Sequence, residues 1–269
     1  MKKRFTLAFL LLTFVAQAQV IPVGFIKPIN TSIPTGDKPV ANNLLLYLDA
    51  TRRASYDASG SIWTDISGVS PANSATLVSG PTFSVANNVG SFTFADSKYA
   101  LTSTLITSSL SAVTFIAWVN PSRAQSNYTG IILSRNGYSN ATGNASGLVI
   151  NMENSINLVS YVWNDVPDTY NWRSLSLRVP NNQWSMIAVS ITSTGAAFYV
   201  VNSSGTIRAT NGYAHSPVSG HKFYVGVDPF DISNRAFKGK IATSMVYASA
   251  LTQTNIVDIY NAQKAAFGL

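Results

Sequence analysis

The stretch Tyr161–Arg173, YVWNDVPDTYNWR, combines the residue types that proteins use to bind sugars. Flat aromatic rings stack on the C–H faces of pyranose rings, while amides, carboxylates and guanidinium groups bond the hydroxyls. Aromatic side chains also bring a large contact area with few rotatable bonds. We therefore predict a ligand-binding surface here. Its candidate residues are Trp163, Asn164, Asp165, Asp168, Tyr170, Trp172 and Arg173.

A purely structural role for these aromatic residues is the alternative. Tyr161 and Trp163 are two positions apart, as on one face of a strand, so one of them can belong to the core. Trp172 can close an edge of the fold. The Asn- and Gly-rich segment Arg135–Gly147 is either a rim of the same site or a simple connection.

Paired carboxylates, which glycoside hydrolysis requires, are scarce in this chain. In retaining enzymes the two carboxyl groups lie about 5 Å apart. The single glutamate, Glu153, has no acidic residue two or five positions away. Asp165 and Asp168 form the nearest acidic pair, and they flank a proline in an expected loop. We interpret them as solvated loop aspartates rather than as an acid and a base.

Other catalytic motifs are also missing from the sequence. His215 and His221 flank SPVSG without a third metal ligand or a nucleophile nearby, so we expect both at the surface. The chain contains no Gly-rich phosphate loop and no G-x-S-x-G motif. These observations disfavour hydrolase activity, and we predict that the protein is not an enzyme and needs no cofactor.

The elements that position these residues are short strands. Apolar or alternating runs of residues occur throughout the chain after position 43, and Gly, Asn, Asp and Pro separate them. This pattern predicts an all-β antiparallel sandwich or barrel. The predicted strands are Leu44–Leu48, Ser91–Phe94, Val113–Val119, Ile131–Leu133, Leu148–Ile150, Ile156–Trp163, Trp184–Ile191, Ala197–Val201, Phe223–Val227 and Ile241–Tyr247.

Only the end of the chain has a helical pattern. Thr252 or Thr254 can cap a helix in which Ile256, Ile259 and Tyr260 share one face, and Gly268 ends it. Within the apolar strands, Trp118 and Trp184 are predicted to be core residues.

The N-terminus predicts export. Residues 1–18 combine a basic start, the apolar run Phe5–Val15 and a small-x-small site ending at Ala18, as in a Sec signal peptide. The apolar run is shorter than the roughly 20 residues of a membrane span. Cleavage removes three basic residues, so the charge falls from +7 to +4. This charge is too small to indicate nucleic-acid binding.

The predicted organisation has three parts. A signal peptide (residues 1–18) precedes an extended, proline-containing arm (residues 19–43), and one domain follows (residues 44–269). The chain has no cysteine, so packing rather than disulfides must stabilise it. We expect a secreted, periplasmic or cell-surface protein without a membrane span.

The closing stretch FKGKIATSMVYASALT (residues 237–252) resembles the last strand of laminin-G-like, concanavalin A-type jelly rolls. Six further segments resemble the same family in the same order, so the likeness extends over about Leu44–Tyr260. They are Leu44–Gly68, Ser79–Ser84, Gly90–Ala100, Val113–Ser122, Asn181–Thr192 and Tyr224–Pro229.

The resemblance implies a two-sheet antiparallel jelly-roll sandwich with a short C-terminal helix. Glycosidases of this type usually carry E-x-D-x-x-E on one strand, which this chain lacks. The family often holds one Ca²⁺ near the chain ends, but the usual acidic positions after Ile241 are neutral here. This leaves only a weak, carbonyl-rich calcium site open. The remaining acidic oxygen sources are Asp49, Asp65, Asp96, Asp228 and Asp231, of which Asp49 and Asp65 are expected to cap turns.

Fold alone does not define function. Our leading hypothesis is a secreted, non-catalytic carbohydrate-binding or adhesion module with a polysaccharide or glycan as its ligand. The alternative is a structural or protein-interaction module of a cell-surface assembly, tethered by the proline-containing arm. A polysaccharide hydrolase or lyase is the third reading.

Overall fold

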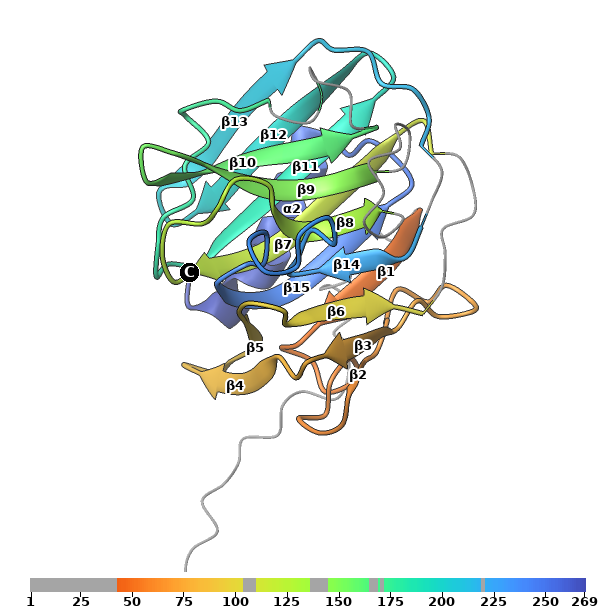
Figure 1. Cartoon of the computed structure of the whole chain (residues 1–269), viewed down its shortest axis with the longest axis vertical. Coiled ribbons are helices and arrows are strands. Elements are labelled where there is room, and N and C mark those ends of the chain that lie inside the picture. The colour runs from red at the N-terminus through yellow and green to blue at the C-terminus, as the bar shows by residue number, and fades with distance from the viewer. Residues whose placement is uncertain (1–42, 104–109, 136–144, 165–168, 170–171, 219–220) are drawn as a thin grey trace, which may run out of the picture.

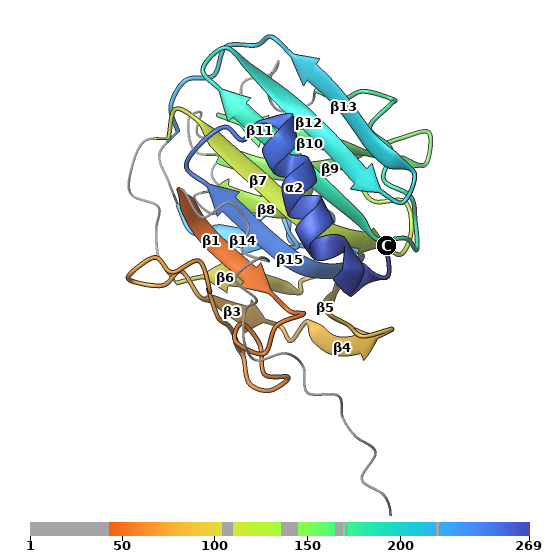
Figure 2. The same cartoon turned by 180° about the vertical axis from the view of Figure 1, so that it is seen from behind.

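The computed structural model describes residues 43–103, 110–135, 145–164, 169, 172–218 and 221–269. Within these residues, the strands form two antiparallel sheets that lie face to face, and one helix covers an outer face (Figures 1 and 2). The prediction of an all-β, two-sheet sandwich with a C-terminal helix is confirmed. The signal-peptide prediction (residues 1–18) and the arm prediction up to residue 42 lie outside the described residues.

Sheet A contains eight strands in the order β13-β12-β11-β7-β15-β5-β4, and β1 pairs with β15 beside this path. The last strand of the chain therefore lies at the centre of the sheet, next to the first (Figure 2). The strands are β1 (Leu44–Asp49), β4 (Thr82–Ala86), β5 (Val89–Phe94), β7 (Val113–Pro121), β11 (Ser185–Thr192), β12 (Gly195–Asn202), β13 (Gly205–Asn211) and β15 (Gly239–Tyr247).

Sheet B contains seven strands in the order β10-β9-β8-β14-β6-β3-β2 and forms the front layer in Figure 1. Its middle strand, β14, pairs with both β8 and β6, which lie far from it in sequence. The strands are β2 (Ile62–Trp63), β3 (Ala75–Val78), β6 (Tyr99–Thr102), β8 (Thr129–Arg135), β9 (Ala145–Glu153), β10 (Ile156–Trp163) and β14 (Phe223–Val225).

Strand β7 shows why six of the seven residues of VTFIAWV are apolar. Side chains alternate between the two faces of a strand. Phe115 and Val119 belong to the main core between the sheets. Ile116 and Trp118 belong to a second apolar cluster on the other face of sheet A. Both faces of β7 are therefore buried, and Trp118 is confirmed as a core residue.

The helix α2 (Gln253–Gln263) begins with a capping box. The backbone N–H of Asn255 donates to Thr252 Oγ1 at 3.2 Å, and the N–H of Thr252 donates to Asn255 Oδ1 at 3.1 Å. These bonds satisfy backbone donors that a helix start leaves free. A 3-10 turn, η1 (Lys264–Phe267), follows, and Gly268 ends it with a φ of 72°. The predicted cap, Thr252, and the predicted end, Gly268, are confirmed.

The helix covers sheet A with its apolar face, on which Ile256, Ile259 and Tyr260 are buried (Figure 2). Trp184 is half-buried at the edge of this cluster, with its ring 5.1 Å from that of Phe267, so its core prediction holds only in part. No helix in the described part of the chain is long and apolar enough to cross a bilayer.

Candidate functional site

The predicted ligand residue Trp163 is buried in the main core, with 1% of its surface exposed. Its Nε1 donates to the carbonyl oxygen of Ser216 at 2.7 Å, and its ring meets His215 edge-on. The strand parity of β10 turns Tyr161 and Trp163 together toward the opposite sheet. The prediction that Trp163 offers a ring face to a ligand is therefore wrong.

Two neighbours of Trp163 also have structural contacts. Asn164 is buried, and its Nδ2 donates to the carbonyl oxygen of Ser216 at 3.1 Å. This burial contradicts its predicted place on a ligand surface. Trp172 is half-buried and stacks on Phe198, with ring centroids 4.4 Å apart and an interplanar angle of 24°. One face of its ring is therefore covered, in agreement with the structural alternative.

Arg173 contacts a hairpin of sheet B. Its Nε lies 3.2 Å from Glu153 Oε2, and its Nη1 donates to the carbonyl oxygen of Met152. Asp165, Asp168 and Tyr170 lie outside the described residues, so their predicted roles stay predictions. The four described members of the predicted surface thus do not form one exposed cluster.

His215 is buried rather than exposed, which contradicts the surface prediction. Its Nε2 lies 2.8 Å from the hydroxyl of Tyr161. Burial lowers the pKa of His215 because the charged imidazolium is poorly solvated inside the protein. His215 therefore belongs to a buried polar contact between β10 and the segment that follows β13.

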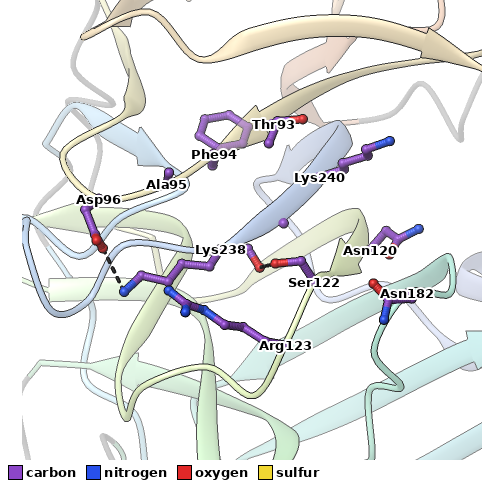
Figure 3. A pocket seen from close by; sticks show the side chains of 11 residues that line it. Thr93, Phe94, Ala95, Asp96, Asn120, Ser122, Arg123, Asn182, Lys238 and Lys240 are labelled. Carbon is purple, nitrogen blue, oxygen red and sulfur yellow. Dashed lines mark hydrogen bonds and ion pairs between the residues drawn. The ribbon is translucent and has the colours of Figure 1, made fainter.

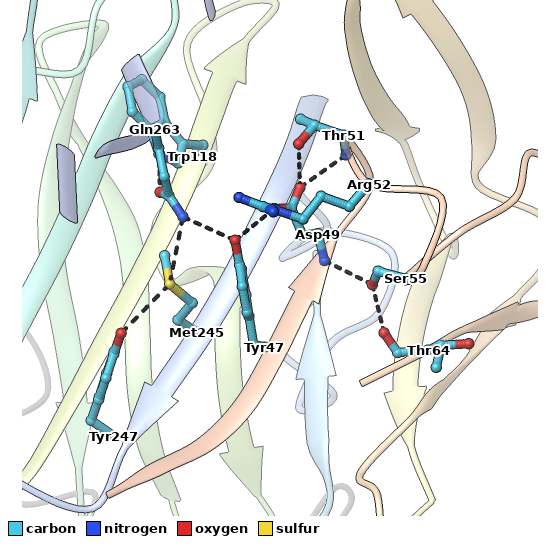
Figure 4. Close-up of polar contacts among 10 residues, drawn as sticks. All are labelled: Tyr47, Asp49, Thr51, Arg52, Ser55, Thr64, Trp118, Met245, Tyr247 and Gln263. Atoms are coloured by element: carbon cyan, nitrogen blue, oxygen red, sulfur yellow. Dashed lines mark hydrogen bonds and ion pairs between the residues drawn. The ribbon is translucent and has the colours of Figure 1, made fainter. Parts of the chain in front are cut away.

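Asp49 is the centre of a polar network at the end of β1 (Figure 4). It accepts hydrogen bonds from the Tyr47 hydroxyl at 2.6 Å, from Thr51 N and Oγ1, and from Arg52 Nε at 2.9 Å. Burial raises the pKa of Tyr47 well above its ordinary value, and the neighbouring Asp49 charge adds to this shift. Gln263 Nε2 donates to the Tyr47 hydroxyl and so links the helix to the network.

Asp65 and Asp228, two of the other four aspartates considered as calcium ligands, are engaged in the same way. Asp65 accepts from Tyr47 N, Ser67 N, Ser67 Oγ and Asn73 N. Asp228 pairs with Arg135 and Arg235. Their oxygens face donors or cations, as those of Asp49 do, and do not fit a family-type calcium site. Among the described residues, no three His, Asp or Glu side chains form a group that could hold a metal ion.

Two hollows on the surface are better candidates for a ligand-binding site than the residues around Trp163. The first, which we call the Tyr56 groove, has a volume of about 610 Å³ and lies between the loop after β1, the β4–β5 hairpin and the end of the chain. Tyr56, Phe83 and Val85 give it an apolar part, and Val85 is 54% exposed. Its polar lining includes the exposed side chains of Arg53, Asp57, Asn87 and Asn88.

Local geometry fixes the shape of the Tyr56 groove. Tyr56 packs edge-on against Phe92, with ring centroids 4.7 Å apart, and its hydroxyl donates to the carbonyl oxygen of Gly60. Asn87 and Asn88 form the two-residue β4–β5 turn with φ values of 52° and 66°. Two consecutive positive φ values match a type I′ hairpin turn, for which Asn is a favoured residue.

The second hollow, the basic groove, has a volume of about 500 Å³ and lies where β5 and β7 end and β15 begins (Figure 3). Arg123, Lys238 and Lys240 line it, together with one acidic residue, Asp96. The Nζ of Lys238 lies 2.8 Å from Asp96 Oδ1. Lys238 comes just before β15 and Lys240 is its second residue, so the motif FKGKI brings both to the groove, but the sequence does not show that Arg123 joins them.

These features define a jelly-roll sandwich with a helix on one outer face and two lined grooves. The profile of the concanavalin A-like lectin/glucanases superfamily matches residues 92–257, which are 166 of the 269 residues. The chain therefore belongs to this superfamily, as the sequence resemblance predicts. A comparison with curated protein sequences gives no match.

Solved structures share the fold at low sequence identity. Domain 4 of a GH43 extracellular arabinanase from Geobacillus stearothermophilus, solved with arabinotriose, has 14% identity and a TM-score of 0.56, covering 81% of this chain and 98% of that chain. A Trypanosoma rangeli sialidase with 2,3-difluorosialic acid has 13% identity and a TM-score of 0.56, covering 83% of this chain but 33% of the sialidase. An arabinofuranosidase complexed with arabinofuranosyl-alpha-1,2-xylobiose has 10% identity and a TM-score of 0.55, covering 77% of this chain and 51% of that chain.

Proposed function

We propose that this domain is an exported, non-catalytic carbohydrate-binding module and that the Tyr56 groove holds its saccharide ligand. One observation carries the proposal: a single hollow of about 610 Å³ combines an apolar part with four exposed polar side chains. Ligand sites typically combine an apolar lining with a few polar groups that fix orientation. The C–H face of a sugar ring can pack on Val85 and Phe83, while Arg53 and Asp57 bond its hydroxyls.

The non-catalytic part of the proposal is supported by the state of the buried carboxylates. The oxygens of Asp49, Asp65 and Asp228 accept hydrogen bonds or ion pairs from neighbouring groups. A general acid or base must reach its substrate with a free proton or lone pair. Asp57 lines the Tyr56 groove, and no second acidic residue in the described part of the chain lines the same hollow.

Isothermal titration calorimetry against a panel of oligosaccharides tests the proposal. Arabino-oligosaccharides come first, because the arabinanase domain was solved with arabinotriose. We expect one or more neutral saccharides to bind, and we expect Val85→Glu and Arg53→Ala to weaken binding at least tenfold. Val85→Glu places a charge over the apolar part of the groove, and Arg53→Ala removes a hydroxyl-binding group.

Ile207→Glu is the matched control, because Ile207 is a 40% exposed strand residue on β13, at the opposite edge of sheet A. This variant should bind within twofold of the native protein. Absence of any neutral ligand, or equal loss in Ile207→Glu and Val85→Glu, would refute the site. Release of reducing ends or unsaturated sugars by the purified protein would overturn the non-catalytic assignment.

Export is part of the proposal and has its own test. The signal-peptide pattern predicts a mature protein that begins at Gln19. N-terminal sequencing of protein from the periplasm or culture medium should find this residue. Protein that stays in the cytoplasm with Met1 intact would contradict export.

A further inference from the structure

The basic groove contains cations that no acidic side chain neutralises. Lys238 is paired with Asp96, which leaves Arg123 and Lys240. In the described part of the chain, neither Arg123 nor Lys240 has an acidic partner. The described residues of the groove lining therefore carry three positive side chains and one negative side chain.

Lys240 is the residue that most needs an explanation. It is the second residue of β15, is half-buried, and has the neutral residues Thr93 and Asn120 as its partners on the two neighbouring strands. None of the ion pairs in the described part of the chain involves the amine of Lys240. An anionic ligand in the groove would supply the opposite charge.

The walls of the basic groove are firmly held. Gln125 is buried and clamps the backbone of Lys238 from both sides: its Oε1 accepts the Lys238 N–H at 2.8 Å, and its Nε2 donates to the Lys238 carbonyl oxygen at 2.9 Å. Ser122 Oγ donates to the same carbonyl oxygen at 3.0 Å. A site whose backbone is already ordered loses less entropy when a ligand binds.

Neutral polar groups accompany the cations. Asn120, Asn182 and Ser122 line the hollow, and Figure 3 shows Asn120, Asn182 and Lys240 on one side with Arg123 and Lys238 across from them. Amide and hydroxyl groups of this kind suit the hydroxyls of a sugar, and the cations suit its acidic group. The aromatic ring that contributes to the lining, Phe94, is only 1% exposed and cannot stack on a nucleic-acid base.

We infer that the basic groove is a second binding site, separate from the Tyr56 groove, and that it takes an anionic polysaccharide. Carboxylate or sulfate groups of the polysaccharide contact Arg123 and Lys240, and the hydroxyls of the polysaccharide contact Asn120 and Asn182. This assignment goes beyond the proposed neutral-sugar site and does not depend on it.

Binding of an octamer of galacturonate, measured by calorimetry at low salt, tests the inference. The native protein should bind it, and higher salt should weaken binding because salt screens charge pairs. The double variant Arg123→Gln/Lys240→Gln should bind at least tenfold more weakly. Dextran sulfate of similar length serves as a second arm, and its relative affinity shows whether sulfate or carboxylate is the preferred group.

The double variant Arg178→Gln/Lys222→Gln is the matched control. It removes the same charge from two exposed positions outside the groove, and should bind within twofold of the native protein. If both double variants lost affinity equally, the weaker binding would be an effect of net charge alone, and the inference would be overturned. Failure of both acidic polysaccharides to bind, or equally tight binding of single-stranded DNA, would overturn it too.

The two proposed sites can be tested independently of each other. Neutral-saccharide binding in Arg123→Gln/Lys240→Gln should equal that of the native protein, and galacturonate binding in Val85→Glu should also be unchanged. Loss of both ligands in either variant would show that the two grooves are not independent and would contradict the inference.

Discussion

The indole ring of Trp118 on β7 lies nearly parallel to the ring of Phe267 in the last turn, with centroids 3.8 Å apart and an interplanar angle of 9°. Nε1 of Trp118 also donates to Gln263 Oε1 at 2.7 Å. One side chain of sheet A therefore contacts the C-terminal segment through both a stacked ring and a hydrogen bond.

This contact predicts that the chain end stabilises the sandwich. Phe267→Ala should lower the free energy of unfolding by about 3–5 kcal/mol, as for buried aromatic residues generally. Gln263→Leu should cost about 1–3 kcal/mol, because Trp118 Nε1 would stay buried without an acceptor. Urea denaturation measures both. Leu269→Ala, at an exposed site two residues further on, should stay within about 0.5 kcal/mol, and an equal loss there would contradict the prediction.

The backbone geometry at Gly239, beside the basic groove, predicts that only glycine fits this position. Its φ is 154°, and a Cβ atom there would clash with the carbonyl oxygen of Asn120 and with Pro121. Gly239→Ala should therefore destabilise the fold by about 1–3 kcal/mol. Gly212→Ala, where a Cβ meets open space, is the control. Equal melting temperatures for the two variants would show that β7 and β15 can move apart freely.

His215 predicts a loss of stability in mild acid. Burial lowers its pKa in the folded state below its ordinary value of about 6.5. The unfolded chain therefore binds the proton more tightly than the folded chain. The stability that neutral, buried His215 adds is fully present above the pKa that His215 has in the unfolded chain. It is lost as the pH falls from about 6.5 through the lower pKa of His215 in the folded protein.

Thermal unfolding of the native protein and of His215→Gln between about pH 5 and 8 measures this effect. The melting temperature of the native protein should decrease as the pH drops below about 6.5. The melting temperature of the variant should change less over the same pH range. Parallel curves would show that other groups cause the acid sensitivity, because carboxylates titrate in both proteins.

Trp163 and Trp172 predict different outcomes on truncation. Trp163→Ala should lower stability by about 3–5 kcal/mol, since the indole is buried and bonded to Ser216. Trp172→Ala should be milder, because that ring is only half-buried on Phe198. Calorimetry on the folded fraction should find neutral-saccharide binding unchanged in Trp163→Ala. A specific tenfold loss there would restore the sugar-binding hypothesis for this residue.

The longer apolar and alternating runs were sufficient to predict the fold class and most of the long strands. The apolar run Val113–Val119 and the capped helix after Thr252 agree with β7 and α2 because local pattern and burial coincide there. Short strands such as β2 and β6 escaped prediction, since two to four residues carry too little periodic signal and depend on their neighbours for pairing.

The site was less predictable than the fold. The aromatic residues around Trp163 indicated a sugar surface, but alternation alone does not tell which face of a strand meets the opposite sheet. Arg123 and Lys240 are more than a hundred residues apart, and only the pairing of β7 with β15 brings them to one groove.

By itself the sequence determined that this chain folds as an antiparallel sandwich closed by a capped helix, because periodicity and capping are encoded by neighbouring residues. Tertiary structure alone decided which polar residues share a hollow and which aromatic rings are buried. The physical reason is that a groove in a sandwich is lined by residues from strands and loops distant in sequence, and their side chains meet only after the sheets have paired.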